Sequence, residues 1–220
     1  MKYIILGAAL SPFVRKVRVF CAEKGIGYDL EPISPFDPPE GWRDISPLGR
    51  IPVLALQDDD GSRRYLPDSS VICAFLEQMH PQPNLIPTEP FSRGDTLWLE
   101  EFADSELASC IGMGMFRPVV LARMTGGEPD LAKAEETYEG PLSKLLDYLE
   151  KQLGDREFYV EDRLTLADIA VATSFINMAH AGFTVDATRW PGLAGFLERM
   201  HGRESFAACI AEELAMLGRR

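Results

Sequence analysis

The chain has 220 residues, of which 46% are apolar, and a formal net charge of −12. This length fits one large domain or two small ones with an ordinary apolar core. The strong negative charge argues against nucleic acid as the main partner. A membrane span needs about 20 uninterrupted apolar residues. We find no such run in the sequence, so we expect no membrane partner either.

The cysteines are widely separated, and each falls in an apolar stretch: Cys21, Cys73, Cys110 and Cys209. Their spacing matches neither a zinc site nor a redox Cys-x-x-C motif, and the three histidines show no ligand spacing. We therefore expect buried reduced thiols, no metal and a cytoplasmic location. The apolar run at the N-terminus lacks a cleavage-site pattern and is interpreted as a strand rather than a signal peptide.

The first part of the chain alternates between strand and helix patterns. A strand is predicted over 3–6, a helix between Pro12 and the stop signal at Gly25, and a second strand over 28–31. This unit should have parallel strands and a right-handed connection. After a proline-rich loop, two runs at 52–56 and 63–66 flank an Asp/Gly turn and predict an antiparallel hairpin.

A helix opened by Asp68 and Ser69 completes this part, with one apolar face predicted from Val71, Ile72, Phe75, Leu76 and Met79. The order β-α-β-β-β-α is that of an α/β thioredoxin-like domain, which we assign to residues 1–80. Four prolines then make 81–90 a stiff linker.

Residues 91–220 keep helical spacing and predict an all-α C-terminal domain. Long helices are expected over 97–111 and 138–153, and Gly140-Pro141 either kinks or divides the second. Thr165 and Asp168 form a capping box that opens the central core helix. Pro191 suits the first position of the next helix. The apolar stripe of the last helix is expected to be Phe206, Ile210, Leu214 and Leu217.

Three short segments carry residues suited to binding an anionic ligand. They are Ser11-Pro12-Phe13-Val14-Arg15-Lys16-Val17, Ser46-Pro47-Leu48-Gly49-Arg50-Ile51-Pro52-Val53-Leu54 and Asp68-Ser69-Ser70. The first and third lie at predicted helix N-termini, where free N–H groups and the helix dipole favour negative charge. Taken singly, Ser11 and Ser69 also fit plain helix caps, and an isolated Ile-Pro bond is ordinarily trans.

Taken together and in this order, the three segments resemble the glutathione-binding half of the soluble glutathione transferases. Residues 158–169, Phe-Tyr-Val-Glu-Asp-Arg-Leu-Thr-Leu-Ala-Asp-Ile, are similar to the capping motif of that family, so the resemblance spans nearly the whole chain. The Ser-Pro-Phe segment with Arg15 and Val17 looks closest to the serine-type enzymes, including the tau class and related bacterial members.

The resemblance implies a role for each matching residue. Ser11 would hydrogen-bond the glutathione sulfur and favour the thiolate. Ile51 would pair its backbone with the cysteinyl part of glutathione, which requires Pro52 to be cis. Ser69 and Asp68 would bind the γ-glutamyl carboxylate and ammonium, and Arg50 would meet the glycyl carboxylate. A homodimer is also implied.

Some positions depart from the family pattern. Ser46 stands where Asn is usual, Asp68 where Glu is commoner, and Arg50 where Lys is commoner. Glu161 stands where Gly is usual, which costs up to about 1–2 kcal/mol if the turn there needs a positive φ. Arg15, Lys16 and Arg18 form either a basic mouth to the site together with Arg50, or a solvated helix face.

The second-substrate pocket is predicted from Phe13, Phe36, Met113 and Phe116, since Met and Phe suit an adaptable apolar site. The alternative for 112–117 is ordinary core beside a helix end loosened by glycine. The predicted function is conjugation of glutathione to an electrophilic hydrophobic compound, as in detoxification. The alternatives are a glutathione-dependent isomerase, dehalogenase or ether-cleaving enzyme, and a non-catalytic ligand-binding or regulatory member similar to the bacterial stringent-starvation proteins.

Overall fold

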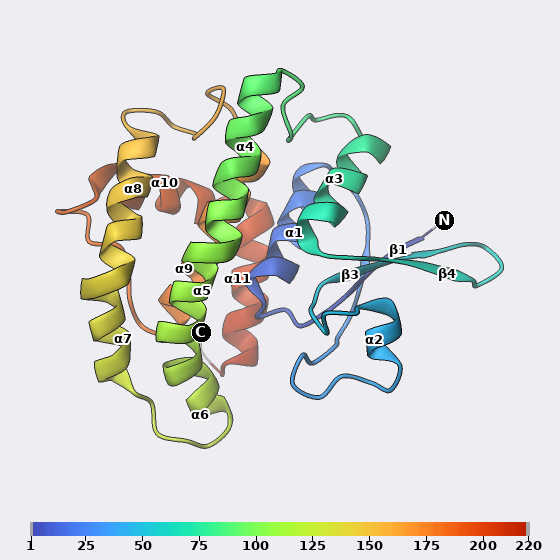
Figure 1. Ribbon diagram of the computed structural model, residues 1–220, viewed down its shortest axis with the longest axis horizontal. Helices are drawn as coiled ribbons and strands as arrows, with labels where there is room; N and C mark the ends of the chain where they lie inside the picture. The colour runs from blue at the N-terminus through green and yellow to red at the C-terminus, as the bar shows by residue number, and fades with distance from the viewer. Residues whose placement is uncertain (1, 219–220) are drawn as a thin grey trace.

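A four-stranded sheet forms the centre of the N-terminal part in the computed structural model, which describes residues 2–218 (Figure 1). The strands are β1 (Lys2–Leu6), β2 (Asp29–Glu31), β3 (Val53–Gln57) and β4 (Arg63–Pro67), in the order β2-β1-β3-β4. β1 pairs with β2 in parallel and with β3 antiparallel, and β3 pairs antiparallel with β4. The predicted strands, the parallel pair and the hairpin are confirmed, and so is the thioredoxin-like fold.

Three helices accompany this sheet: α1 (Pro12–Glu23), the short α2 (Trp42–Ile45) and α3 (Ser69–Met79). The sequence predicts α1 and α3 but not α2, which is only one turn long and follows a proline-rich stretch. The predicted face of α3 is partly wrong. Ile72 and Leu76 are buried, whereas Val71 and Met79 are each 46% exposed.

The helical part begins with one continuous helix from Pro90 to Met124. It comprises α4 (Pro90–Phe102), η1 (Ala103–Leu107), α5 (Ala108–Ile111), η2 (Gly112–Leu121) and α6 (Ala122–Met124), with η marking π-helical turns. By length and composition alone this helix would be able to cross a membrane. In the fold it packs on α9, and some of its residues, such as Leu107 and Val119, belong to the domain core. About a third of its apolar stretch, 33%, is buried.

A second continuous helix follows, made of α7 (Leu131–Thr137), η3 (Tyr138–Leu142) and α8 (Ser143–Leu153). Gly140 and Pro141 lie in η3, so they do not divide the helix. A π-helical turn accommodates Pro141, which has no N–H to donate. Gly114 of η2 packs against this helix so closely that an added Cβ would lie 2.4 Å from the Thr137 side chain. Gly114 therefore permits close helix packing instead of loosening a helix end.

The last three helices are α9 (Leu166–His180), α10 (Pro191–His201) and α11 (Glu204–Met216). The capping box of Thr165 and Asp168 is present at the start of α9, which is buried along nearly its whole length, and Pro191 occupies the first turn of α10. The predicted stripe of α11 is wrong in part: Phe206, Cys209 and Glu213 are its buried residues. The carboxylate is buried there because Arg15 binds it.

Two sequence expectations about local chemistry are also resolved. Glu161 has a φ of 57°, so the turn does use the left-handed conformation at a residue where the family prefers Gly, and its carboxylate pairs with Arg163 at 2.7 Å. The four thiols are free, and all but Cys110 are fully buried. Burial raises the pKa of Cys21 to about 12, so this thiol stays protonated at neutral pH.

Candidate glutathione-binding site

Ser11 lies between β1 and α1 and is the N-cap of α1. Its hydroxyl accepts a hydrogen bond from the Val14 N–H at 3.4 Å, and Pro12 occupies the first turn. The plain reading of Ser11 as a helix cap is therefore correct. It does not exclude chemistry, because the hydroxyl proton of a capping serine is still available for donation. Ser11 also lies at the N-terminus of the twelve-residue helix α1, where the positive end of the helix dipole favours a negative charge.

The second segment enters β3 through a cis peptide bond between Ile51 and Pro52. The expectation that Pro52 is cis is confirmed. The sheet pairing of β3 begins at Val53, so the N–H and C=O of Ile51 lie outside the ladder. Ser46 supports the preceding turn by donating its hydroxyl to the Arg50 carbonyl at 2.7 Å. Ser46, which stands where Asn is usual, thus stabilises this turn through a side-chain bond to the backbone.

Asp68 and Ser69 stand at the N-terminus of α3. Asp68 has a φ of 81°, a left-handed conformation that is unusual for a residue other than glycine and is concentrated at functional sites. Its Oδ1 atom accepts from the N–H groups of Ser70 and Val71, and neither of these bonds uses Oδ2. The cap leaves the N–H of Ser69, the first residue of the helix, without an intrahelical partner.

The sheet topology brings these three segments to one edge. β1 ends, β3 begins and β4 ends at this edge, as the pairing of Leu6 with Val53 and of Val53 with Pro67 shows. The Asp68 N–H donates to the Pro52 carbonyl at 3.3 Å. Gly7 lies beside this turn, since an added Cβ would be in van der Waals contact with Ile51 Cβ at 3.4 Å and with Pro52 Cα at 3.7 Å. The loop that carries Ser11 is therefore packed against the Ile51-Pro52 turn, and the Pro52 carbonyl of that turn holds the Asp68 N–H.

The basic residues of α1 do not form a mouth to this site, and neither do they form a solvated face. Arg15 and Lys16 are fully buried and Arg18 nearly so. Arg15 pairs with Glu213, and Arg18 with Glu212. Lys16 binds Glu100 and Asp104. Burial alone would lower the pKa of Lys16, but these two carboxylates outweigh it and raise the pKa above its ordinary value. Of the predicted basic group, only Arg50 is exposed.

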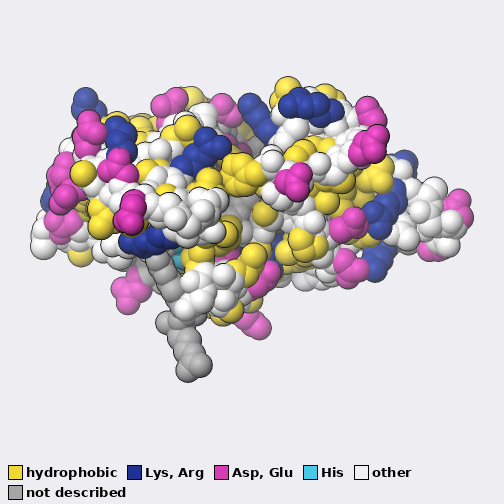
Figure 2. All heavy atoms as spheres, turned by 90° about the horizontal axis from the view of Figure 1, so that it is seen from below, with side chains coloured by type: hydrophobic (Ala, Val, Ile, Leu, Met, Phe, Trp, Pro, Cys, Tyr) yellow, Lys and Arg dark blue, Asp and Glu magenta, His cyan; other side chains and the backbone are white. Residues whose placement is uncertain are grey.

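The residues predicted to line the second-substrate pocket lie in both parts of the chain. Phe36 is 63% exposed, and the Arg117 guanidinium of η2 lies 5.8 Å from the centre of its ring. Arg117 also contacts the Met113 sulfur at 3.5 Å. Phe13 and Phe116 are half-buried. Figure 2 shows the molecule from below, with apolar side chains gathered near the middle of this face. Arg117 itself was not predicted, because one arginine in an apolar helix gives no signal of its own.

Met113 also borders a separate hollow of about 430 Å³ between the long helix and α7, lined by Cys110, Lys133 and Thr137 among others. Nothing in the sequence marks this hollow as part of the site. Among residues 2–218, no group of three or more His, Cys, Asp or Glu side chains is arranged to hold a metal ion.

These features define a two-domain protein, with a thioredoxin-like domain that carries the candidate site and an all-helical domain beside it. Residues 6–84 match the model of the glutathione S-transferase N-terminal domain, and residues 116–213 match that of the C-terminal domain. A glutathione S-transferase from Methylobacillus flagellatus, solved with GSH bound, is 30% identical over 94% of this chain and 98% of its own, with a TM-score of 0.74. The chain therefore belongs to the glutathione S-transferase family.

Other relatives show how far function varies among similar proteins. The uncharacterized GST-like protein YibF of Escherichia coli is 29% identical over 92% of this chain and 96% of its own. A stringent starvation protein A homolog of Coxiella burnetii is 24% identical over 92% of this chain and 88% of its own. Family membership alone therefore does not define the activity.

Proposed function

We propose that the protein is a serine-type glutathione transferase, in which Ser11 stabilises the glutathione thiolate for attack on an electrophilic hydrophobic compound. The observation that carries this proposal is the meeting of Ser11, the cis Ile51-Pro52 turn and Asp68 at one edge of the sheet. The similarity to a relative solved with GSH bound supports it.

In this proposal the peptide ligand is held mainly by groups at the ends of strands and helices, outside the hydrogen-bond ladders described above. The Ser69 N–H at the start of α3 binds the γ-glutamyl carboxylate, and Asp68 Oδ2 binds the ammonium. The N–H and C=O of Ile51 pair with the cysteinyl backbone. Arg50, which is exposed at the mouth of the site, meets the glycyl carboxylate.

The chemistry follows from the pKa of the thiol. A free thiol has a pKa of about 8.5, so only a few per cent is thiolate at neutral pH. A hydrogen bond from Ser11 and the N-terminus of α1 both favour the charged form. The thiolate then forms a bond from sulfur to an electrophilic carbon held beside it. At an aryl halide the halide departs with the electron pair, whereas at an enone or an epoxide the displaced electron pair stays on the product and takes up a proton from water.

The electrophile is proposed to bind against Phe13, Phe36, Met113 and Phe116. Arg117 adds one cationic group beside Phe36, and its guanidinium makes no ion pair among the described residues. A panel of electrophiles should therefore include aryl halides, enones and epoxides, each with and without a carboxylate. Screening the same panel for isomerisation, dehalogenation and ether cleavage tests the alternative enzymes.

A non-catalytic binding role, as in the starvation-protein relatives, is the alternative from another class. Retention of the protein on immobilised glutathione and elution by free glutathione favour the enzyme. Passage through the column without retention favours the binding role and contradicts our proposal.

Replacing Ser11 with alanine should lower turnover by roughly 10- to 100-fold at neutral pH and leave the KM for glutathione within about threefold. The reason is that the hydroxyl acts on the sulfur, whereas the other segments hold the peptide. Ser11→Gly is the matched variant, because glycine is also accepted at an N-cap but has no hydroxyl to donate and adds no charge. Turnover at the wild-type level in either variant would remove Ser11 from the mechanism.

We also propose a cytoplasmic homodimer. Large apolar side chains are exposed on β4, α3 and α4, which follow one another along the chain: Tyr65, Val71, Met79, Phe91, Leu97 and Trp98. If these elements form the interface, Val71→Glu should shift the mass in solution from twice the chain mass of 24.5 kDa to the single chain. Light scattering after gel filtration measures this. Met124→Glu, at an exposed methionine outside these elements, should leave the dimer intact.

A further inference from the structure

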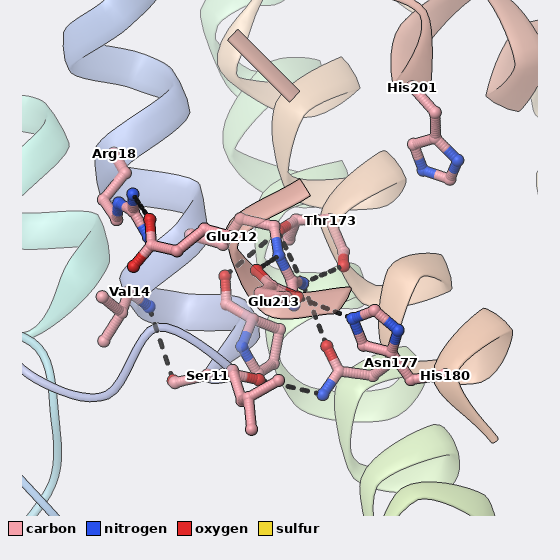
Figure 3. A network of polar contacts seen from close by, with 12 residues as sticks. Ser11, Val14, Arg18, Thr173, Asn177, His180, His201, Glu212 and Glu213 are labelled. Carbon is pink, nitrogen blue, oxygen red and sulfur yellow. Dashed lines mark hydrogen bonds and ion pairs between the residues drawn. The ribbon is translucent and has the colours of Figure 1, made fainter. Parts of the chain in front are cut away.

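A buried polar cluster joins α1 to α9 and α11 (Figure 3). It consists of Arg15, Thr173, Asn177, His180 and Glu213, and each of these residues is at most 4% exposed. Arg15 donates to both oxygens of Glu213, through Nε at 2.6 Å and through Nη2. Its Nη1 donates to the Thr173 carbonyl at 2.7 Å and to Asn177 Oδ1 at 2.9 Å. His180 Nε2 lies 2.8 Å from Glu213. We call this set the Arg15 cluster.

The Arg15 cluster ends on the backbone on either side of Ser11. The Asn177 Nδ2 donates to the Leu10 carbonyl at 3.1 Å, and the Thr173 hydroxyl donates to the Pro12 carbonyl at 3.2 Å. Both donors come from α9, the buried helix of the other domain. The residue before Ser11 and the residue after it are thus each held by one side chain across the domain boundary.

The arginine determines how Asn177 is oriented. A guanidinium has only donors, so the amide oxygen of Asn177 must face Arg15. The amide nitrogen must then face the Leu10 carbonyl. Glu213 holds the guanidinium in place with two parallel hydrogen bonds, a geometry with little freedom. The orientation of the α9 donors is therefore set by the Arg15–Glu213 pair.

The Ser11 N–H donates to the Ala8 carbonyl and the Ser11 carbonyl accepts from the Arg15 N–H, both at 3.0 Å. The loop around Ser11 and its hydroxyl are held more loosely. Ser11 is only half-buried, it follows the loop 7–10, and its capping bond to Val14 is long at 3.4 Å. Catalytic groups lose rate steeply when they are displaced, by up to about 100-fold for 1 Å. Two hydrogen bonds to the flanking carbonyls would supply the restraint that the cap alone does not.

We propose that Thr173 and Asn177 are positioning residues for Ser11, held in place by Arg15 and Glu213. This inference rests on the proposed function, because it concerns how Ser11 is presented to the glutathione sulfur. It gives the helical domain a part in activating the thiol, in addition to its part in holding the electrophile. Neither residue is expected to touch glutathione.

The test compares three substitutions of buried threonines. Thr173→Val keeps the shape and removes the hydroxyl, whereas Thr173→Ser keeps the hydroxyl. Thr96→Val on α4 is the matched control, because Thr96 is equally buried and its hydroxyl donates to the Ser92 carbonyl of its own helix. Four quantities are measured for each variant: turnover, the KM for glutathione, the melting temperature and the pKa of the bound glutathione thiol. The ultraviolet absorbance of the thiolate gives this pKa.

We expect Thr173→Val to lower turnover by about 5- to 10-fold and to raise the pKa of the bound thiol by about half a unit or more. Its KM for glutathione should stay within twofold of the wild type. Thr173→Ser and Thr96→Val should keep the wild-type turnover and thiol pKa. A merely structural role for Thr173 predicts a lower melting temperature with an unchanged thiol pKa, and that result would overturn the proposal.

Ser11→Ala separates this inference from the proposed function. If Ser11→Ala lowers turnover and Thr173→Val does not, the positioning role fails and the proposed function stands. If both lower turnover, the double variant should be no slower than Ser11→Ala alone, because Thr173 then acts only through Ser11. A wild-type protein that neither binds nor uses glutathione would overturn both.

Discussion

Arg15→Met is expected to lower the free energy of unfolding by about 3–5 kcal/mol at pH 7, because it removes the guanidinium that pairs with both oxygens of the buried Glu213 carboxylate and leaves that carboxylate only His180 of its two partners in the Arg15 cluster. Both side chains of the pair are fully buried. Burial alone would raise the pKa of Glu213, but Arg15 and His180 outweigh it and lower the pKa below its ordinary value. Without Arg15 the burial effect prevails, so the deficit should shrink as the pH falls and Glu213 takes up a proton. Urea unfolding from pH 7 to pH 4 measures both effects.

Two further variants show that the cost lies in the buried charge left behind. Arg15→Met combined with Glu213→Leu should recover at least half of the loss, since a buried ion pair is often replaced by apolar side chains at little cost. Arg18→Met is the matched control on the same helix. Its partner Glu212 is 41% exposed and can be solvated again, so the loss should be about 1 kcal/mol or less. An equal loss in Arg15→Met and Arg18→Met would contradict the argument from burial.

The Arg15 cluster also shows why sequence reasoning stops where it does. In the sequence, Arg15, Lys16 and Arg18 share a helix with Val14, Val17 and Phe20, and charged residues among apolar ones ordinarily predict a solvated face. They are buried because their partners come from the other domain. Glu213 is 198 positions away from Arg15, and Glu100 is 84 positions away from Lys16. Helical periodicity describes only residues a few positions apart, so it cannot predict such pairs.

Local patterns did better where the cause is local. Four predictions of this kind are confirmed: the hairpin, the capping box at Thr165, the first-turn Pro191 and the helix end at Leu153. Each depends on a few adjacent residues. The three binding segments were predicted to act together from their resemblance to the glutathione transferases, and the strand order of the sheet brings them to one edge. The stripe of α11 was misread at Glu213 for the reason given above: an acidic residue in a helix is taken for a surface position until its partner is known.

Asp168→Ala is expected to destabilise the protein by about 3–5 kcal/mol, because it orphans three donors in the core. The Asp168 carboxylate accepts from the Tyr159 N–H at 2.8 Å, the Thr165 N–H at 2.7 Å and the Thr165 hydroxyl at 2.9 Å. It is completely buried at the start of α9. Asp130→Ala is the matched control, since Asp130 caps α7 at the surface with one bond to the Lys133 N–H. It should cost about 1 kcal/mol.

The Asp168 carboxyl should also make the free energy of unfolding fall as the pH rises, which is opposite to the usual effect of a carboxyl group. Burial raises the pKa of Asp168 to about 6, although its hydrogen bonds oppose this shift. Between the unfolded pKa near 4 and the folded pKa, the folded state holds the extra proton, so the contribution of Asp168 is present at low pH and is lost as the pH rises through 6. Relative to Asp168→Asn, which does not titrate, the wild type should lose up to about 3 kcal/mol from pH 4 to pH 6.5. Carboxylates with a lowered pKa, such as Glu213, make stability rise with pH. Their contributions are the same in both proteins and therefore cancel in the comparison. A difference that stays constant with pH would mean that Asp168 remains ionised in the core, held by its three donors.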